Sequence, residues 1–179
     1  MSTDSIRNPY LPTPMHVLHA YYESTDRTLK TLELSFDNPQ DSAAFFRKFN
    51  PGQFCQLSVF GKGESPIGVA SAAWEGDFVR FTVQKMGAVT KALHKLQPGD
   101  PIGMRGPLGN GFPIEAWKGK NLVIIGGGCA FSTLYALTKH VQHPQNRPDF
   151  GQIIVIYGAR SSGLCMYKHD IQSWYKRED

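Results

Sequence analysis

The chain has 179 residues, which is enough for one large domain or two small ones. Apolar residues make up 41% and charged residues 19%, a balance that supports a packed core and excludes an intrinsically disordered chain. The formal net charge is only +4 and basic residues form no long run, which excludes the dense basic surface of a nucleic-acid-binding protein. We therefore expect no nucleic-acid partner.

The cysteines are too few and too scattered for a metal site. Cys55, Cys129 and Cys165 are an odd number, and no two of them have C-x-x-C spacing. We therefore predict no disulfide framework, no metal site and no iron–sulfur cluster built by this chain. No apolar stretch approaches the ~20 residues that span a bilayer. The polar segment 1–14 is an N-terminal extension without the apolar core of a signal peptide, so we expect no membrane span and a cytoplasmic location.

Residues 15–115 are predicted to form one all-β domain. Short strands alternate with turns that contain Gly and Pro, and one helix is predicted over 89–96, where Val89, Leu93 and Leu96 share a face. Six short strands at this spacing predict a small closed antiparallel barrel. The predicted strands are 15–23, 28–36, 53–60, 67–73, 78–84 and 101–105.

The pattern changes in residues 120–179, which are predicted to form an α/β domain. An apolar strand over 121–125 leads into a glycine triplet, a helix over 130–141, a strand over 153–157 and a helix over 166–175. This order is the beginning of a parallel, doubly wound sheet. The predicted fold class is thus a six-stranded antiparallel barrel followed by an incomplete Rossmann-like domain. Two parallel strands leave a face and an edge uncovered, so either the chain is part of a longer polypeptide or a partner covers that surface.

The glycine triplet is the first candidate binding site. Glycines between a strand and a helix let backbone amides approach a phosphate at the positive helix end. The third small residue of the full dinucleotide fingerprint is missing, since Phe131 occupies its position. The alternative interpretation is an ordinary tight turn. The triplet consists of Gly126, Gly127 and Gly128.

A second candidate lies at the beginning of the helix predicted over 89–96. Gly87 permits close backbone approach, the amides of Ala88 and Val89 can bind an anion, and the Thr90 hydroxyl can add a further contact. The alternative is an ordinary capped helix start in which Thr90 bonds only to the backbone.

Together these segments resemble the ferredoxin–NADP reductase superfamily. Within it, the chain is most similar to the flavin (gamma) subunits of cytoplasmic hydrogenases (sulfhydrogenases) and to the flavin subunit of anaerobic sulfite reductase. The likeness spans nearly the whole chain in the order typical of that superfamily. The matching stretches are 8–12, 51–54, 63–67, 87–90, 105–113, 126–128 and 157–160.

The resemblance implies an FAD-binding electron-transfer subunit that moves electrons between NAD(P)H and a partner redox protein. FAD would lie at the junction of the two domains, with its pyrophosphate at Gly87, Ala88, Val89 and Thr90. NAD(P)H would bind at the glycine triplet, and the partners would be iron–sulfur or hydrogenase-type redox subunits. No side chain is expected to act as a catalytic group, because the redox chemistry belongs to the cofactor. The residues expected along the flavin and its ribityl chain are Ser65, Pro66, Ile67, Gly68 and Val69.

The chain departs from the pattern of these relatives at several positions. They usually carry a hydroxyl residue where this chain has Gly68, and Gly and Pro where it has Ala130 and Thr133. The later part of their nucleotide domain and their cysteine cluster are also absent. The alternative hypothesis is therefore a degenerate, non-catalytic assembly or regulatory subunit that kept the fold and lost nicotinamide chemistry.

Overall fold

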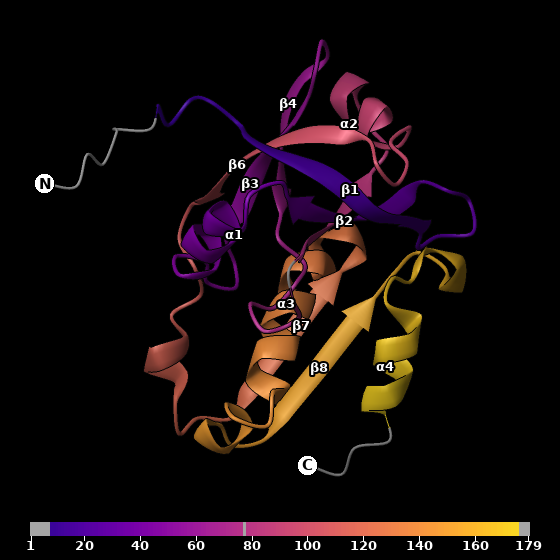
Figure 1. Ribbon diagram of the computed structural model, residues 1–179. Helices are drawn as coiled ribbons and strands as arrows, with labels where there is room; N and C mark the ends of the chain where they lie inside the picture. The colour runs from indigo at the N-terminus through magenta and orange to yellow at the C-terminus, as the bar shows by residue number, and fades with distance from the viewer. Residues whose placement is uncertain (1–7, 77, 176–179) are drawn as a thin grey trace, which may run out of the picture.

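The computed structural model describes residues 8–76 and 78–175, in a barrel of short strands above a smaller α/β unit (Figure 1). The strands are β1 (Thr13–Tyr22), β2 (Leu29–Phe36), β3 (Phe54–Val59), β4 (Gly63–Gly68), β5 (Phe78–Gln84), β6 (Pro101–Leu108), β7 (Leu122–Gly127) and β8 (Ile153–Gly158). The α-helices are α1 (Pro39–Phe46), α2 (Ala88–Leu93), α3 (Phe131–Gln142) and α4 (Lys168–Trp174). Short 3₁₀ turns are η1 (Ile114–Trp117), η2 (Gly128–Ala130), η3 (Arg147–Asp149) and η4 (Ser162–Leu164).

The first six strands form one antiparallel sheet in the order β4-β3-β6-β1-β2-β5. Its two outer strands approach each other where Val69 forms a bridge with Phe81 and the Ala70 N–H donates to the Arg80 carbonyl at 2.8 Å. The predicted six-stranded antiparallel barrel is confirmed. Its interior is filled by buried apolar side chains from five of its strands, among them Met15, Leu32, Leu57, Phe81 and Ile102, and Ile67 of β4 packs against them while only partly buried.

The second sheet contains β7 and β8, paired in parallel from Leu122 opposite Ile153 to Gly127 opposite Gly158. A Cβ on Gly126 would lie 2.7 Å from side-chain atoms of both Phe131 and Leu134, so the glycine permits the close packing of α3 on β7. The predicted beginning of a parallel nucleotide-binding-type sheet is confirmed.

The strand predicted over 67–73 is wrong. The structure places β4 earlier, and the chain after Gly68 crosses from the β3 side toward β5 as irregular backbone. The apolar residues Val69, Ala70 and Ala72 suggested a strand because they are buried, but they close the barrel. Most of β4 is exposed, so its sequence lacks the alternation that marks a half-buried strand.

Helix α1 was not predicted, although its beginning carries recognisable signals. The Asn38 side chain accepts a hydrogen bond from the Gln40 N–H at 2.9 Å, and Pro39 occupies the first turn. The other predicted helices and strands lie within a few residues of the observed ones. In the predicted N-terminal extension, residues 1–7 lie outside the described residues and β1 already begins at Thr13; residues 176–179 of the predicted α/β domain also lie outside them.

An ionic cluster joins the barrel to α3. The Glu75 carboxylate, with its side chain only 6% exposed, accepts hydrogen bonds from Arg80 at 2.9 Å and from Lys139 of α3 at 2.7 Å. Arg80 also pairs with Glu33 of β2 at 2.9 Å. Because these groups are largely withdrawn from water, removing one partner leaves a poorly solvated charge. The cluster therefore fixes α3 relative to β2 and β5.

A second set of contacts supports the same interface. The ring of Tyr135 on α3 stacks on Tyr167 with centroids 3.8 Å apart, and its hydroxyl donates to Asp170. Burial raises the pKa of the Tyr135 hydroxyl above its ordinary value, so it remains a proton donor. The Tyr167 hydroxyl in turn lies 2.5 Å from the hydroxyl of Thr82 on β5. The interface thus combines stacking with buried hydrogen bonds.

We predict that Glu75→Gln lowers the free energy of unfolding by about 2 kcal/mol or more, because the partners left behind are partly buried charges. The measurement is equilibrium denaturation in urea. The matched control is Glu115→Gln, which removes an ion pair with Lys118 in which the Glu115 side chain is 85% exposed, and it should leave stability unchanged. Equal effects of the two substitutions would contradict this account of the interface.

Candidate functional site

The segments predicted to bind a cofactor meet at the junction of the barrel and the α/β unit. A Cβ on Gly63 would lie 3.6 Å from Val89, so β4 and the first turn of α2 are in contact. Ile67 and Val89 are both partly buried and pack on the barrel core. The structure therefore brings residues 65–69 and 87–90 together along one side of the barrel.

The glycine triplet approaches the same junction from the α/β unit. The Cys129 thiol lies 3.7 Å from the Thr82 carbonyl, which puts η2 beside the last residues of β5. One turn into α3, the Thr133 side chain reaches Gly68 of β4. Burial raises the pKa of the Cys129 thiol, so this group is not an activated thiolate.

The beginning of α2 shows which groups remain available there. The Thr90 hydroxyl accepts hydrogen bonds from the N–H groups of Met86 and Gly87, both at 2.9 Å, and donates to the Gly87 carbonyl at 3.2 Å. This is the capped arrangement in which Thr90 bonds only to the backbone. Within residues 8–76 and 78–175, a Cβ placed on Gly87 meets no atom within 4 Å apart from its chain neighbours, so the described surface in front of this residue is open.

Buried polar groups hold α2 in place from its other end. The Lys30 ammonium, in a residue only 2% exposed, donates to the carbonyls of His94 at 3.0 Å and Leu96 at 2.6 Å. These carbonyls belong to the C-cap residue of α2 and to the turn that follows it, at the helix end where a cation is favoured. The His94 ring bonds through Nε2 to the Val83 carbonyl of β5 at 2.9 Å. The position of residues 87–90 is thus set by β2 and β5.

We predict a pH dependence of stability from His94. Burial, together with the nearby charges of Lys30 and Lys85, lowers the pKa of His94 below its ordinary value of 6.5. The unfolded chain then binds the proton more readily, so stability falls as the pH drops below about 6.5 and goes on falling until the folded-state pKa is reached.

His94→Gln should flatten the free energy of unfolding between pH 7 and pH 5, measured by urea denaturation at each pH. The control is His169→Gln, whose side chain is 98% exposed, and it should keep the wild-type slope. A wild-type slope in His94→Gln would show that this imidazole is not responsible.

A cavity of about 370 Å³ lies beside the glycine triplet. Gly128 has a left-handed φ of +53°, which favours glycine, and among the described residues only its chain neighbours come within 4 Å of its Cβ position. Sequence reasoning did not select Lys85 and Arg160, the two cationic side chains in this cavity. The stretch 157–160 carried a signal, but only the fold brings it next to Lys85. The lining residues are Asp26, Thr28, Leu29, Gln84, Lys85, Gly128, Cys129, Ala159, Arg160 and Leu164.

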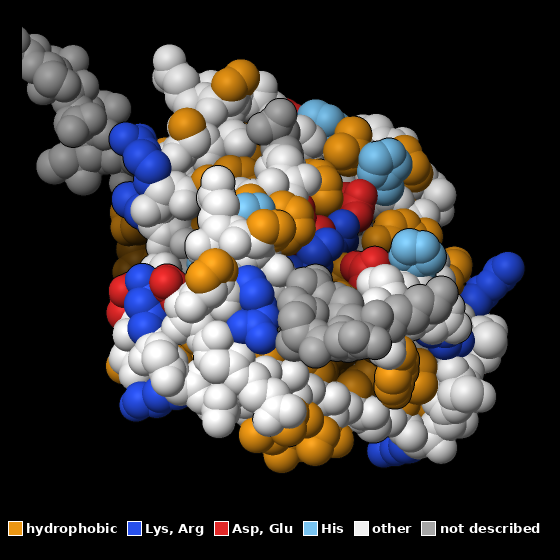
Figure 2. Space-filling view, turned by 90° about the horizontal axis from the view of Figure 1, so that it is seen from below, with side chains coloured by type: hydrophobic (Ala, Val, Ile, Leu, Met, Phe, Trp, Pro, Cys, Tyr) orange, Lys and Arg blue, Asp and Glu red, His pale blue; other side chains and the backbone are white. Residues whose placement is uncertain are grey.

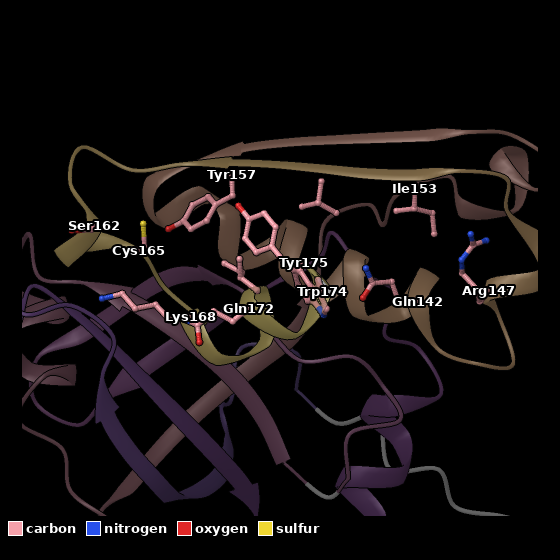
Figure 3. Close-up of a pocket in the computed structure, with 12 residues that line it drawn as sticks. Gln142, Arg147, Ile153, Tyr157, Ser162, Cys165, Lys168, Gln172, Trp174 and Tyr175 are labelled. Atoms are coloured by element: carbon pink, nitrogen blue, oxygen red, sulfur yellow. The ribbon is translucent and has the colours of Figure 1, made fainter. Parts of the chain in front are cut away.

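A different cavity, of about 420 Å³, lies between β8 and α4 and contains none of the predicted site residues (Figure 3). Tyr157 and Ile153 project into it from the strand, and Trp174 from the helix. The opposite face of the small sheet is exposed at Val123 and Ile125 of β7, which are 59% and 67% accessible. The view from below likewise shows hydrophobic side chains among the charged ones (Figure 2).

No group of three or more His, Cys, Asp or Glu side chains within residues 8–76 and 78–175 is arranged to hold a metal ion. In the same part of the chain, the helices lack the length and apolar character needed to cross a membrane.

Curated proteins with similar sequences include subunits of two oxidoreductases. Over 162 residues the chain is 36% identical to the gamma subunit of sulfhydrogenase 1 from Pyrococcus furiosus. This match covers 90% of this chain and 53% of that protein. Over 127 residues it is 36% identical to a probable electron transfer subunit of dihydroorotate dehydrogenase B (NAD⁺) from the same organism, covering 71% and 45%. The chain spans about half the length of the curated relatives it matches. No protein-family model matches it.

Solved structures give the same fold. The ferredoxin–NADP⁺ reductase of Neisseria gonorrhoeae, with bound FAD and NADP, superimposes with a TM-score of 0.72 at 20% identity over 90% of this chain and 63% of that one. The resemblance to the ferredoxin–NADP reductase superfamily is confirmed. The stretches that carried it in the sequence include β4, the beginning of α2 and the glycine triplet, which the structure gathers at one junction.

The residues at this junction fit the FAD that the superfamily implies. The backbone at Gly87 and at Gly128 is open to a ligand, because a side chain at either position would project into free space. Ile67 offers a partly buried apolar surface, and Ser65 and the exposed β4 backbone offer polar groups beside it. The wall is closed at one position, Gly68, where Thr133 fills the space.

Proposed function

We propose that the chain binds FAD at the junction of the barrel and the α/β unit and acts as an electron-transfer polypeptide. Residues 65–69 would line the flavin and ribityl chain, and residues 87–90 would hold the pyrophosphate. The observation that carries the proposal is the contact of β4 with the first turn of α2, next to an open backbone at Gly87. The 36% identity to a sulfhydrogenase gamma subunit supports it.

Bound FAD and the protein chain would have different roles in electron transfer. Bound FAD would supply the redox chemistry, exchanging electrons in pairs or singly. The chain itself would bind and orient the cofactor: Ile67 excludes water from one side of the ring, and Gly87 lets the backbone approach the phosphates. The ionic cluster around Glu75 keeps α3 at a fixed separation from the barrel.

A nicotinamide nucleotide would bind at the glycine triplet. Lys85 and Arg160 line the cavity beside Gly128, and cationic side chains suit the pyrophosphate of such a ligand. Within the described residues neither of these two side chains forms an ion pair, so both remain available to an anion. The electrons would then pass between NAD(P)H and a partner redox protein of the iron–sulfur or hydrogenase type, the kind of complex that the names of the relatives describe.

The direct test is to purify the protein, refold it with excess FAD, remove free cofactor, and record the absorbance released on denaturation. We expect about one FAD per chain. The variant Gly87→Val should lower FAD affinity at least tenfold with little loss of stability. Its side chain would occupy the open space in front of α2, and its backbone, with φ −102° and ψ −169°, is extended and suits valine.

The matched control is Gly158→Val, a glycine with equally open space at the end of β8 and outside the two segments 65–69 and 87–90. This variant should bind FAD like the wild type. A wild-type chain that folds and retains no FAD would refute the proposal. If that chain nevertheless forms a stable complex with other redox subunits, the non-catalytic assembly or regulatory function replaces it.

A further inference from the structure

Two positions at which this chain departs from its relatives, Gly68 and Thr133, contact each other. They are 65 residues apart in the sequence, on β4 and α3, and a Cβ placed on Gly68 would overlap the Thr133 hydroxyl oxygen. No other atom that approaches the position is nearer than the remaining carbons of Thr133, at 3.6 and 3.9 Å. The two residues therefore share one volume, which holds either a side chain at position 68 or the hydroxyl at position 133.

The Thr133 hydroxyl has no hydrogen-bond partner within residues 8–76 and 78–175. The next hydroxyl along the same helix, that of Thr138, donates to the Leu134 carbonyl at 2.8 Å in the usual manner of a helical threonine. Thr133 is only partly buried and its hydroxyl is not fully withdrawn from solvent, so the unpaired group is free to bond to water or to a ligand.

The side chain is also held firmly. Its neighbours on α3, Phe131 and Tyr135, are buried, and Lys139 ties the helix to Glu75. Rotation of the helix is therefore not available to bring the hydroxyl to a protein acceptor. The group stays directed at β4, in the middle of residues 65–69.

We propose that Thr133 supplies the side-chain hydroxyl of the flavin site, contributed from α3 because Gly68 on β4 has no side chain. The inference rests on the proposed function, since it needs FAD along β4. The isoalloxazine ring carries nitrogen and oxygen atoms at its edge, and a hydroxyl can donate to or accept from such atoms. Gly68 and Thr133 thus act as a coupled pair, in which the glycine makes room for the hydroxyl.

The first experiment compares Thr133→Val, which keeps the shape and removes the hydroxyl, with Thr133→Ser, which keeps the hydroxyl. We expect Thr133→Val to weaken FAD binding about three- to tenfold, the effect of one hydrogen bond, and to shift the visible absorption band and the midpoint potential of bound FAD. Thr133→Ser should stay close to wild type in all three. The control Thr138→Val lowers stability and should leave the absorption band and the potential unchanged.

The second experiment moves the hydroxyl from position 133 on α3 to position 68 on β4. Gly68→Ser alone should weaken FAD binding, because its Cβ overlaps the Thr133 hydroxyl. The double variant Gly68→Ser with Thr133→Ala should recover affinity toward wild type. Only one hydroxyl side chain then occupies the volume that positions 68 and 133 share.

The outcomes separate this inference from the proposed function. A folded wild-type chain that binds no FAD overturns both. A wild-type chain that binds FAD while Thr133→Val matches it in affinity, absorption band and potential overturns this inference alone. A double variant that binds FAD no better than Gly68→Ser also overturns it, because the two positions would then be uncoupled.

Discussion

The packing of α3 against the barrel is the constraint on which the rest of the structure depends. The barrel and the small parallel sheet each have a hydrophobic cluster, and a third cluster lies between them, in which Leu29 and Ala70 of the barrel belong with Phe131 and Tyr135 of α3. The ion pairs of Glu75 with Arg80 and Lys139 and the stack of Tyr135 on Tyr167 join the two units further. Buried ion pairs add little net stability compared with apolar packing, but they tolerate only one geometry. This interface therefore sets how β4 faces α3, and with it the shape of the proposed cofactor site.

The same logic governs the other wall of the site. Helix α2 has only six residues and would not be stable alone. Lys30 and His94 attach its C-terminal end to β2 and β5, so its first turn is presented at a fixed place beside β4. The site is accordingly lined mostly by backbone and small residues. The side chains that fix its shape, such as Lys30 and His94, are buried behind this lining.

Much of this architecture could be predicted from the sequence, because several barrel strands alternate in polarity and the two strands of the parallel sheet are continuous apolar runs next to glycine. β4 was misplaced for the opposite reason: its residues are largely exposed, whereas the irregular segment after Gly68 is buried. The predicted strand-to-helix turn at 126–128 is present, and the close packing of Phe131 and Leu134 leaves no room for a side chain at Gly126. Helix α1 begins after a capping residue, Asn38, and this signal in the sequence is enough to predict a helix there.

The details of the site could not be predicted because they depend on contacts between distant segments. Nothing in the spacing of Gly68 and Thr133 indicates that they meet, and only the fold shows that the two positions share one volume. Lys85 and Arg160 share a cavity although β6, β7 and α3 lie between them in the sequence. The hydroxyl of Thr90 could equally have faced a ligand or the backbone, and the fold directs it to the backbone.

The measurement that tests the central claim most directly is a crystal structure of the protein grown with FAD. The account predicts density for the flavin ring along residues 65–69 of the barrel, within hydrogen-bond distance of the Thr133 hydroxyl, with the diphosphate at Gly87. Density for FAD elsewhere, for example in the cavity between β8 and α4, would contradict it.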